Sequence, residues 1–126
     1  MAENNKKQRH NFRKLEVWKE AIALTTDIFL ITKSFPNDER FGLISQMTRS
    51  AASVPSNIAE GTSRKSDKHF VTFLETALGS AFELETQLIV SNNVDYMAND
   101  AFEKLLAKNQ HIQNMIFNLI EKLENN

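Results

Sequence analysis

The chain has 126 residues, of which 41% are hydrophobic and 25% charged, and its formal net charge is −1. A chain of this size and composition fits one folded domain with a hydrophobic core. Because it contains no cysteine, disulfides, thiolate catalysis and iron–sulfur clusters are excluded. The first twenty residues are polar, and no run approaches the eighteen apolar residues of a membrane span, so we expect a cytoplasmic protein with no membrane contact.

Positive charge is concentrated at the N-terminus. Residues 1–12 show no hydrophobic periodicity, so we expect a flexible basic arm there, followed by a bundle domain over residues 13–126. With two glutamates set against them, six cations give the first nineteen residues a charge of +4 and leave −5 for the rest: Lys6, Lys7, Arg9, Arg13, Lys14 and Lys19.

The first periodic segment predicts a helix that ends before Pro36. Its apolar residues alternate steps of four and three, which is the spacing of one helical face: Val17, Ala21, Leu24, Ile28, Ile31 and Phe35. Pro36 cannot continue a helix, and it disfavours helical geometry at the residue before it.

A second helix is predicted to start at Asp38 and Glu39, whose charges complement the positive end of a helix dipole. Its apolar face is Ile44, Met47, Ala51, Val54 and Ile58. Pro55 falls inside this pattern, which stays in phase beyond it, so we expect a kink rather than an end. Gly61 is the expected terminator.

Two further helices follow. The third is expected to start with Ser66 as N-cap and to end at Asn92 and Asn93. The fourth is expected to start at Asp100, with Glu103 completing a capping box. Four apolar faces joined by short connections predict an all-α protein, an antiparallel up-and-down four-helix bundle.

Other apolar residues lie beside these four faces: Trp18, Phe29, Phe82, Ile89, Phe117 and Ile120. A wide core explains some of them, and burial between subunits explains the rest. Small residues on the second and third helices favour close packing of the two: Ala51, Ala52, Ala59, Ala77, Gly79, Ser80 and Ala81.

No catalytic or metal site emerges from the polar residues. His10, His69 and His111 form no pair that would place two ligands on one helical face, so we expect no metal. Glu83 and Glu85 are two residues apart and point to different faces of a helix. With no nucleophile–base pair and no phosphate-binding loop, we expect neither enzyme activity nor a cofactor.

Asn109 interrupts the apolar face of the fourth helix, where a buried amide needs hydrogen-bond partners. Gln46, Asn57 or Glu60 of the second helix are the expected partners, and a structural contact that fixes helix register is favoured over a ligand site.

The basic arm also has two interpretations. Terminal charge can simply be solvated, or the cations listed above can contact the phosphates of RNA or DNA. No ladder of aromatic residues accompanies them, which argues against a dedicated reader of single strands.

Several blocks of the sequence resemble the 23S ribosomal RNA intervening-sequence proteins. In chain order they are Phe12–Lys19, Phe35–Pro36, Glu39–Leu43, Ser45–Met47, Val54–Gly61, Phe73–Leu74, Ala77–Ser80 and Glu83–Leu88. The resemblance spans about residues 12–124, and Pro-Ser-Asn-Ile-Ala-Glu-Gly is its most specific part. It implies a four-helix bundle that forms a ring-shaped homopentamer. Some members are encoded within insertions in ribosomal RNA genes.

A related branch, the accessory variability determinants of diversity-generating retroelements, is strongly basic and binds nucleic acid and a reverse transcriptase. This chain is slightly acidic and departs from that branch. The sequence therefore predicts a non-enzymatic oligomeric scaffold or adaptor, a homopentamer with a protein or nucleic-acid partner. The alternative is a weak RNA- or DNA-binding accessory protein that acts through the basic arm.

Overall fold

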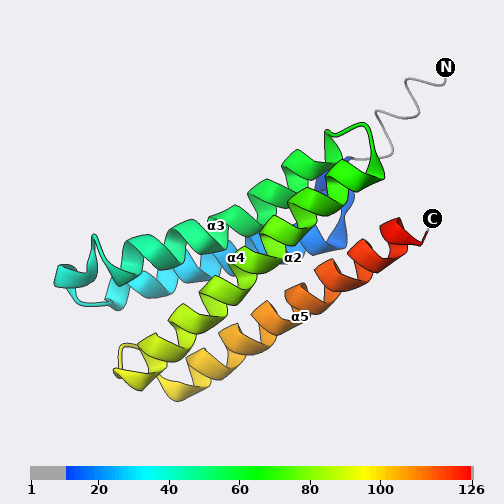
Figure 1. Cartoon of the computed structure of the whole chain (residues 1–126). Helices are drawn as coiled ribbons and strands as arrows, with labels where there is room; N and C mark the ends of the chain where they lie inside the picture. The colour runs from blue at the N-terminus through cyan, green and yellow to red at the C-terminus, as the bar shows by residue number, and fades with distance from the viewer. Residues whose placement is uncertain (1–10, 126) are drawn as a thin grey trace.

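The computed structural model describes residues 11–125, which are all-α (Figure 1). Its four long helices are α2 (Glu16–Ile31), α3 (Leu43–Thr62), α4 (Asp67–Asn93) and α5 (Asn99–Glu124). Three short 3-10 helices lie between or before them: η1 (Phe12–Lys14), η2 (Thr32–Ser34) and η3 (Asn37–Glu39). The described residues contain no strand.

The four helices pack as a bundle in which the chain reverses direction at each connection (Figure 1). Each helix contacts the next one along the chain, and α2 also contacts α5, which closes the bundle. The helices α2 and α4 are therefore diagonal to one another. Their outward faces point in different directions.

The core is made by the periodic apolar residues of all four helices. The largest side chains that are fully buried are Ile28, Met47, Ile58, Leu74, Leu84, Leu88, Ile112 and Ile116. Burying such a side chain contributes roughly 1.5–3 kcal/mol of transfer free energy. The predicted all-α bundle with one apolar face per helix is confirmed.

Helix α3 runs without interruption through Pro55, and Met47 and Ile58 on either side of it are both fully buried. The amount of bending at Pro55 stays a prediction. The predicted start of this helix at Asp38 and Glu39 is wrong, because those residues form η3 and α3 begins only at Leu43. Gly42 separates the two with backbone angles that belong to neither helix.

Gly61 does not terminate α3, which continues through Thr62. It is buried where α3 crosses α4, and a Cβ placed there would lie 2.8 Å from Phe70 Cδ1 and 2.9 Å from the Cβ of Phe73. Glycine is required here because the two helices approach too closely for a side chain. Gly79 is different, since a Cβ there would meet nothing within 4 Å.

The predicted N-cap of α4 is confirmed, because the Ser66 hydroxyl accepts a hydrogen bond from the His69 backbone N–H at 3.2 Å. This helix also ends at Asn93, as expected. The predicted capping box of the fourth helix is wrong. Helix α5 begins at Asn99, and its N-cap residue, Ala98, has no side chain that can accept a hydrogen bond.

Asn109 is fully buried, but its partner is on α4 rather than α3. Its Nδ2 donates to the backbone carbonyl of Ala81 at 2.9 Å, while its Oδ1 has no hydrogen-bond partner among the described residues. The predicted contact with Gln46, Asn57 or Glu60 is therefore wrong. The residue links α4 to α5 and fixes how these two neighbours align.

Polar side chains also join α3 to α4. Ser50 Oγ donates to Gln87 Oε1 at 2.6 Å, and the hydroxyls of Ser53 and Ser80 are 2.8 Å apart. Small side chains allow the two helices to come close enough for these bonds. Among residues 11–125, no helix has the length and hydropathy that crossing a membrane requires.

Candidate self-association surface

Large apolar side chains are exposed on the outside of the bundle as well as buried within it. Those exposed are Ile22, Phe29, Leu30, Phe41, Phe82, Ile89, Val90, Val94 and Phe117. Exposed apolar residues that gather in one place mark interaction surfaces more often than isolated ones do. Their distribution over the helices therefore matters more than their number.

On α2 the exposed residues follow one outward line. Ile22 and Phe29 are seven residues apart, which is two helical turns, and Leu30 lies next to Phe29. Ala21 and Ile28, the neighbours of Ile22 and Phe29 in sequence, are buried. Helix α2 thus has an apolar face toward the core and a second, narrower one toward solvent. We call Ile22, Phe29 and Leu30 the α2 outer surface.

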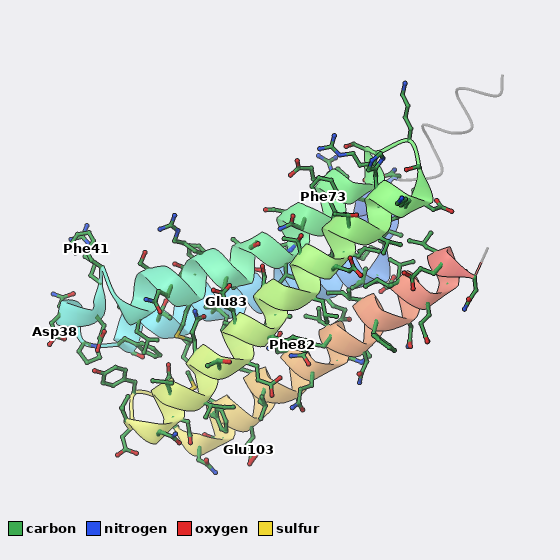
Figure 2. The ribbon with its side chains drawn as sticks, viewed as in Figure 1. Asp38, Phe41, Phe73, Phe82, Glu83 and Glu103 are labelled. Carbon is green, nitrogen blue, oxygen red and sulfur yellow. The ribbon has the colours of Figure 1, made fainter. Side chains whose placement is uncertain are left out.

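A second outward group spans α4 and α5. Phe82 and Ile89 are two turns apart on α4, and Figure 2 shows Phe82 on the α5 side of that helix. Glu85 lies between them and accepts a hydrogen bond at 2.7 Å from Gln113 of α5.

Phe117 is one turn along α5 from Gln113, so it shares the outward face that the Glu85–Gln113 bond reaches. We call Phe82, Ile89 and Phe117 the α4–α5 outer surface.

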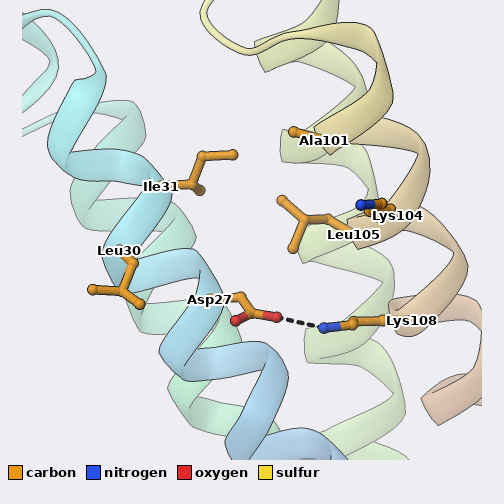
Figure 3. Close-up of a pocket in the computed structure, with 7 residues that line it drawn as sticks. All are labelled: Asp27, Leu30, Ile31, Ala101, Lys104, Leu105 and Lys108. Atoms are coloured by element: carbon orange, nitrogen blue, oxygen red, sulfur yellow. Dashed lines mark hydrogen bonds and ion pairs between the residues drawn. The ribbon is translucent and has the colours of Figure 1, made fainter.

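A groove of about 370 Å³ runs between α2 and α5 (Figure 3). Asp27 and Lys108 form an ion pair across it at 2.7 Å, and Ile31 and Leu105 point toward each other beside that pair.

Leu30 points away from α5, toward the outside of α2. Lys104 on the rim makes no ion pair among the described residues. The groove is shallow and mostly apolar, and it holds no cluster of groups suited to catalysis.

Phe41 is the most exposed large apolar residue in the described part of the chain, with 87% of its surface accessible, at the end of the bundle opposite η1 (Figure 2). The guanidinium of Arg40 lies 5.2 Å from its ring centroid. The same loop is anchored by Tyr96, whose hydroxyl donates to Glu39 Oε2 at 2.8 Å. This hydrogen bond, together with burial and the negative charge of Glu39, raises the pKa of Tyr96.

Residues 13–118 match the model of one protein family, described as 23S rRNA-intervening sequence protein. The match covers most of the chain, including all of α2, α3 and α4. The chain belongs to this family.

A solved structure supports the fold of this intervening-sequence protein. It is a protein of unknown function from the S23 ribosomal protein family of Bacteroides thetaiotaomicron, 21% identical in sequence, with a TM-score of 0.75. The alignment covers 82% of this chain and 97% of the other. At this identity the likeness extends to the fold alone. A comparison with curated proteins found no match.

The predicted basic residues of this intervening-sequence protein are only partly described. Lys6, Lys7 and Arg9 lie outside the described residues, as does most of the arm expected over residues 1–12.

Arg13 and Lys14 belong to η1 and are exposed. Lys19 is on α2, where its ammonium lies 3.3 Å from a carboxylate oxygen of Glu16, so its charge is partly compensated.

The histidines are dispersed. His69 Nδ1 is 2.9 Å from the Ser66 hydroxyl at the start of α4, His111 is exposed on α5, and His10 lies outside the described residues. Among residues 11–125, no three His, Cys, Asp or Glu side chains come close enough to hold a metal ion.

Of the apolar residues placed beside the main faces by the sequence, Phe29, Phe82, Ile89 and Phe117 are exposed. Trp18 is partly buried against the core, and Ile120 is buried. The exposure of Phe41 was not predicted, because the second helix was expected to start at Asp38 and to include it. The sequence feature that could have indicated its exposure is the position of a large aromatic residue in a polar segment directly before Gly42.

Proposed function

We propose that this protein is a non-catalytic scaffold that self-associates through its outer apolar surfaces into a homopentamer. The observation that carries this proposal is the presence of two separate exposed apolar surfaces, the α2 outer surface and the α4–α5 outer surface. We include a cytoplasmic location in the proposal.

Two different surfaces on one chain favour a ring over a two-fold dimer. A two-fold dimer pairs one patch with the same patch of its partner, whereas a ring pairs two different patches head to tail. The α2 outer surface of one subunit would cover the α4–α5 outer surface of the next. Burial of Phe29 and Phe82 in this contact would contribute about 25 cal/mol for each Å² of apolar surface removed from water.

The test is the molar mass of the full chain and of two surface variants, measured by light scattering coupled to gel filtration. In a head-to-tail ring, Phe29→Ser and Phe82→Ser each remove one side of every contact, so each should reduce the mass to that of the monomer. Phe41→Ser is the matched control, because it removes an exposed phenylalanine outside both surfaces and should leave the mass unchanged.

Circular dichroism would show that all three variants keep their helical content. Loss of assembly in only one of the two surface variants would point to a two-fold contact and contradict the ring. Loss in Phe41→Ser would place the interface elsewhere.

A second function is favoured by the exposed cations of η1, which continue the basic sequence before them. We propose weak binding of RNA or DNA through Lys6, Lys7, Arg9, Arg13, Lys14 and Lys19. Five such segments on one ring would raise the effective concentration of positive charge and strengthen binding through multivalency. Changing Lys6, Lys7 and Arg9 together to glutamine in the full chain should weaken binding to a labelled duplex at low salt. Unchanged binding would exclude this segment.

A further inference from the structure

The connection between α3 and α4 lies beside η1. Thr25 Oγ1 of α2 donates to the carbonyl of Ala51 of α3 at 2.9 Å, which fixes how the two helices align. Because they run in opposite directions, the start of α2 lies next to the end of α3, and η1 contacts α3. Cations of the connection, far from η1 in sequence, therefore share one end of the bundle with it.

Four exposed cations gather at this end, which we call the basic corner: Arg13 and Lys14 of η1, and Arg64 and Lys65 of the α3–α4 connection. Figure 2 shows several side chains with nitrogen tips around this part of the molecule. None of the large apolar side chains exposed among residues 11–125 belongs to η1 or to residues 63–69.

Acidic residues offset only part of this charge. Glu60 lies 3.1 Å from Arg64, whose guanidinium also lies 4.7 Å from the ring centroid of Phe73. Lys14 and Lys65 make no ion pair among the described residues. The basic corner ends at Lys68, because Lys68 lines a pocket together with Asp67, Glu75 and Glu124.

The opposite end of the bundle is acidic. Its loops and helix ends carry Asp38, Glu39, Asp95, Asp100 and Glu103 against Lys33, Arg40 and Lys104. The positive charge is local to the corner: residues 11–20 and 60–69 carry six cations against four carboxylates, and the end of α5 adds Glu121 and Glu124 against Lys122. A polyanion would be attracted to the basic corner and repelled from the far end, even though the net charge of the chain is close to zero.

We propose that the basic corner binds the phosphate backbone of a nucleic acid, with the α3–α4 connection contributing contacts that the N-terminal segment cannot make alone. This inference rests on the second proposed function and extends it to the body of the bundle. A membrane surface is disfavoured because the corner has no exposed large apolar side chain to insert. Long, exposed cations from two segments suit a partner with evenly repeated negative charge.

The experiment compares two double variants of the full chain that remove the same charge. Lys14→Gln with Lys65→Gln neutralises one cation of each segment of the basic corner, both without an ion pair among residues 11–125. The matched control, Lys33→Gln with Lys104→Gln, neutralises two exposed lysines at the acidic end. Binding to a fluorescein-labelled 20-base-pair DNA duplex is measured by anisotropy from low to physiological salt, and the molar mass of each variant is checked by light scattering.

The corner variant should bind on the order of tenfold more weakly than the parent at 0.1 M salt. Its plot of log K against log salt should be shallower by about 1.8, which corresponds to two lost phosphate contacts. The control should bind as the parent does. Equal weakening in both double variants would mean that only net charge matters and would overturn the inference.

Other results separate this inference from the function on which it rests. If neutralising Lys6, Lys7 and Arg9 weakens binding but the corner variant binds as the parent does, the N-terminal segment acts alone and the basic corner is not a site. If no protein binds even at low salt, both proposals fall. If polyglutamate of equal charge displaces the duplex as well as unlabelled duplex does, the partner is an acidic protein rather than a nucleic acid.

Discussion

Helix α4 has an inner and an outer apolar face, and the two differ in what they contribute. Leu84 and Leu88 are completely buried, whereas Phe82 is 53% exposed although it is only two residues from Leu84. The inner face accounts for the folding of a single chain because its side chains belong to the buried core, where α4 packs against α3 and α5. The outer face is not part of that core, and its exposed apolar surface is where we propose that contacts between chains form.

The largest effect is expected from shortening an inner residue and an outer residue of this helix. Leu84→Ala should lower the free energy of unfolding by about 2–5 kcal/mol, because it leaves a cavity in the core. Phe82→Ala should change it by no more than about 0.5 kcal/mol. Urea denaturation measures both, in a Phe29→Ser background so that association does not add to the stability. A similar loss for both would assign Phe82 to the core.

Alanine substitutions at the buried Gly61 and at the exposed Gly79 should change the free energy of unfolding in opposite directions. Gly61→Ala places a methyl group against Phe70 and Phe73. The resulting overpacking should lower the free energy of unfolding by about 1–3 kcal/mol. Gly79→Ala should stabilise the protein by about 0.5–1 kcal/mol, because alanine favours a helix and nothing lies within 4 Å. Thermal denaturation would show these shifts, and a stable Gly61→Ala variant would show that α3 and α4 can separate without cost.

The buried amide of Asn109 is expected to matter less than the space it fills. Asn109→Leu should change the free energy of unfolding by no more than about 1 kcal/mol, because it loses one hydrogen bond to Ala81 but also removes a buried Oδ1 that has no partner among the described residues. Asn109→Ala should cost about 1–3 kcal/mol, because it adds a cavity to the lost hydrogen bond. A leucine variant less stable than the alanine variant would mean that the amide itself is essential.

The smallest effect on the free energy of unfolding is expected from removing the exposed ion pair across the α2–α5 groove. Lys108→Gln should lower the free energy of unfolding by only about 0.2–1 kcal/mol at low salt, because exposed ion pairs are well screened by water. The difference from the parent should shrink toward zero near 1 M salt, where the Debye length is only about 3 Å. A cost that persists at high salt would indicate that packing of the lysine stem, rather than its charge, closes the groove.

The inner face could be predicted from the sequence because helical periodicity directly encodes it. Each of Leu84, Ile58 and Ile116 belongs to a series of residues spaced by three and four on its own helix, and all three are buried. Phe82 and Phe117 could be identified as residues outside that pattern, but their exposure depends on how the helices align. Spacing within one helix does not specify that alignment.

The errors have the same physical origin. Gly61 was assigned as a helix terminator because glycine is common at that position, whereas its close approach to Phe70 depends on a neighbouring helix. The hydrogen-bond partner of Asn109 was predicted on α3 for want of the same information, whereas Asn109 bonds to Ala81 of α4. The basic corner likewise requires the fold, because Lys14 and Lys65 are brought to one end only by the reversal of the chain.

The most direct test of the proposal that the outer surfaces join chains is the molar mass of the unmodified full-length protein. Light scattering coupled to gel filtration should give about 72 kDa, the mass of five copies of the 14.4 kDa chain. The value should stay constant as the protein is diluted through the micromolar range. A mass of 14.4 kDa at every concentration would contradict both the ring and the assignment of Phe29 and Phe82 to its contacts.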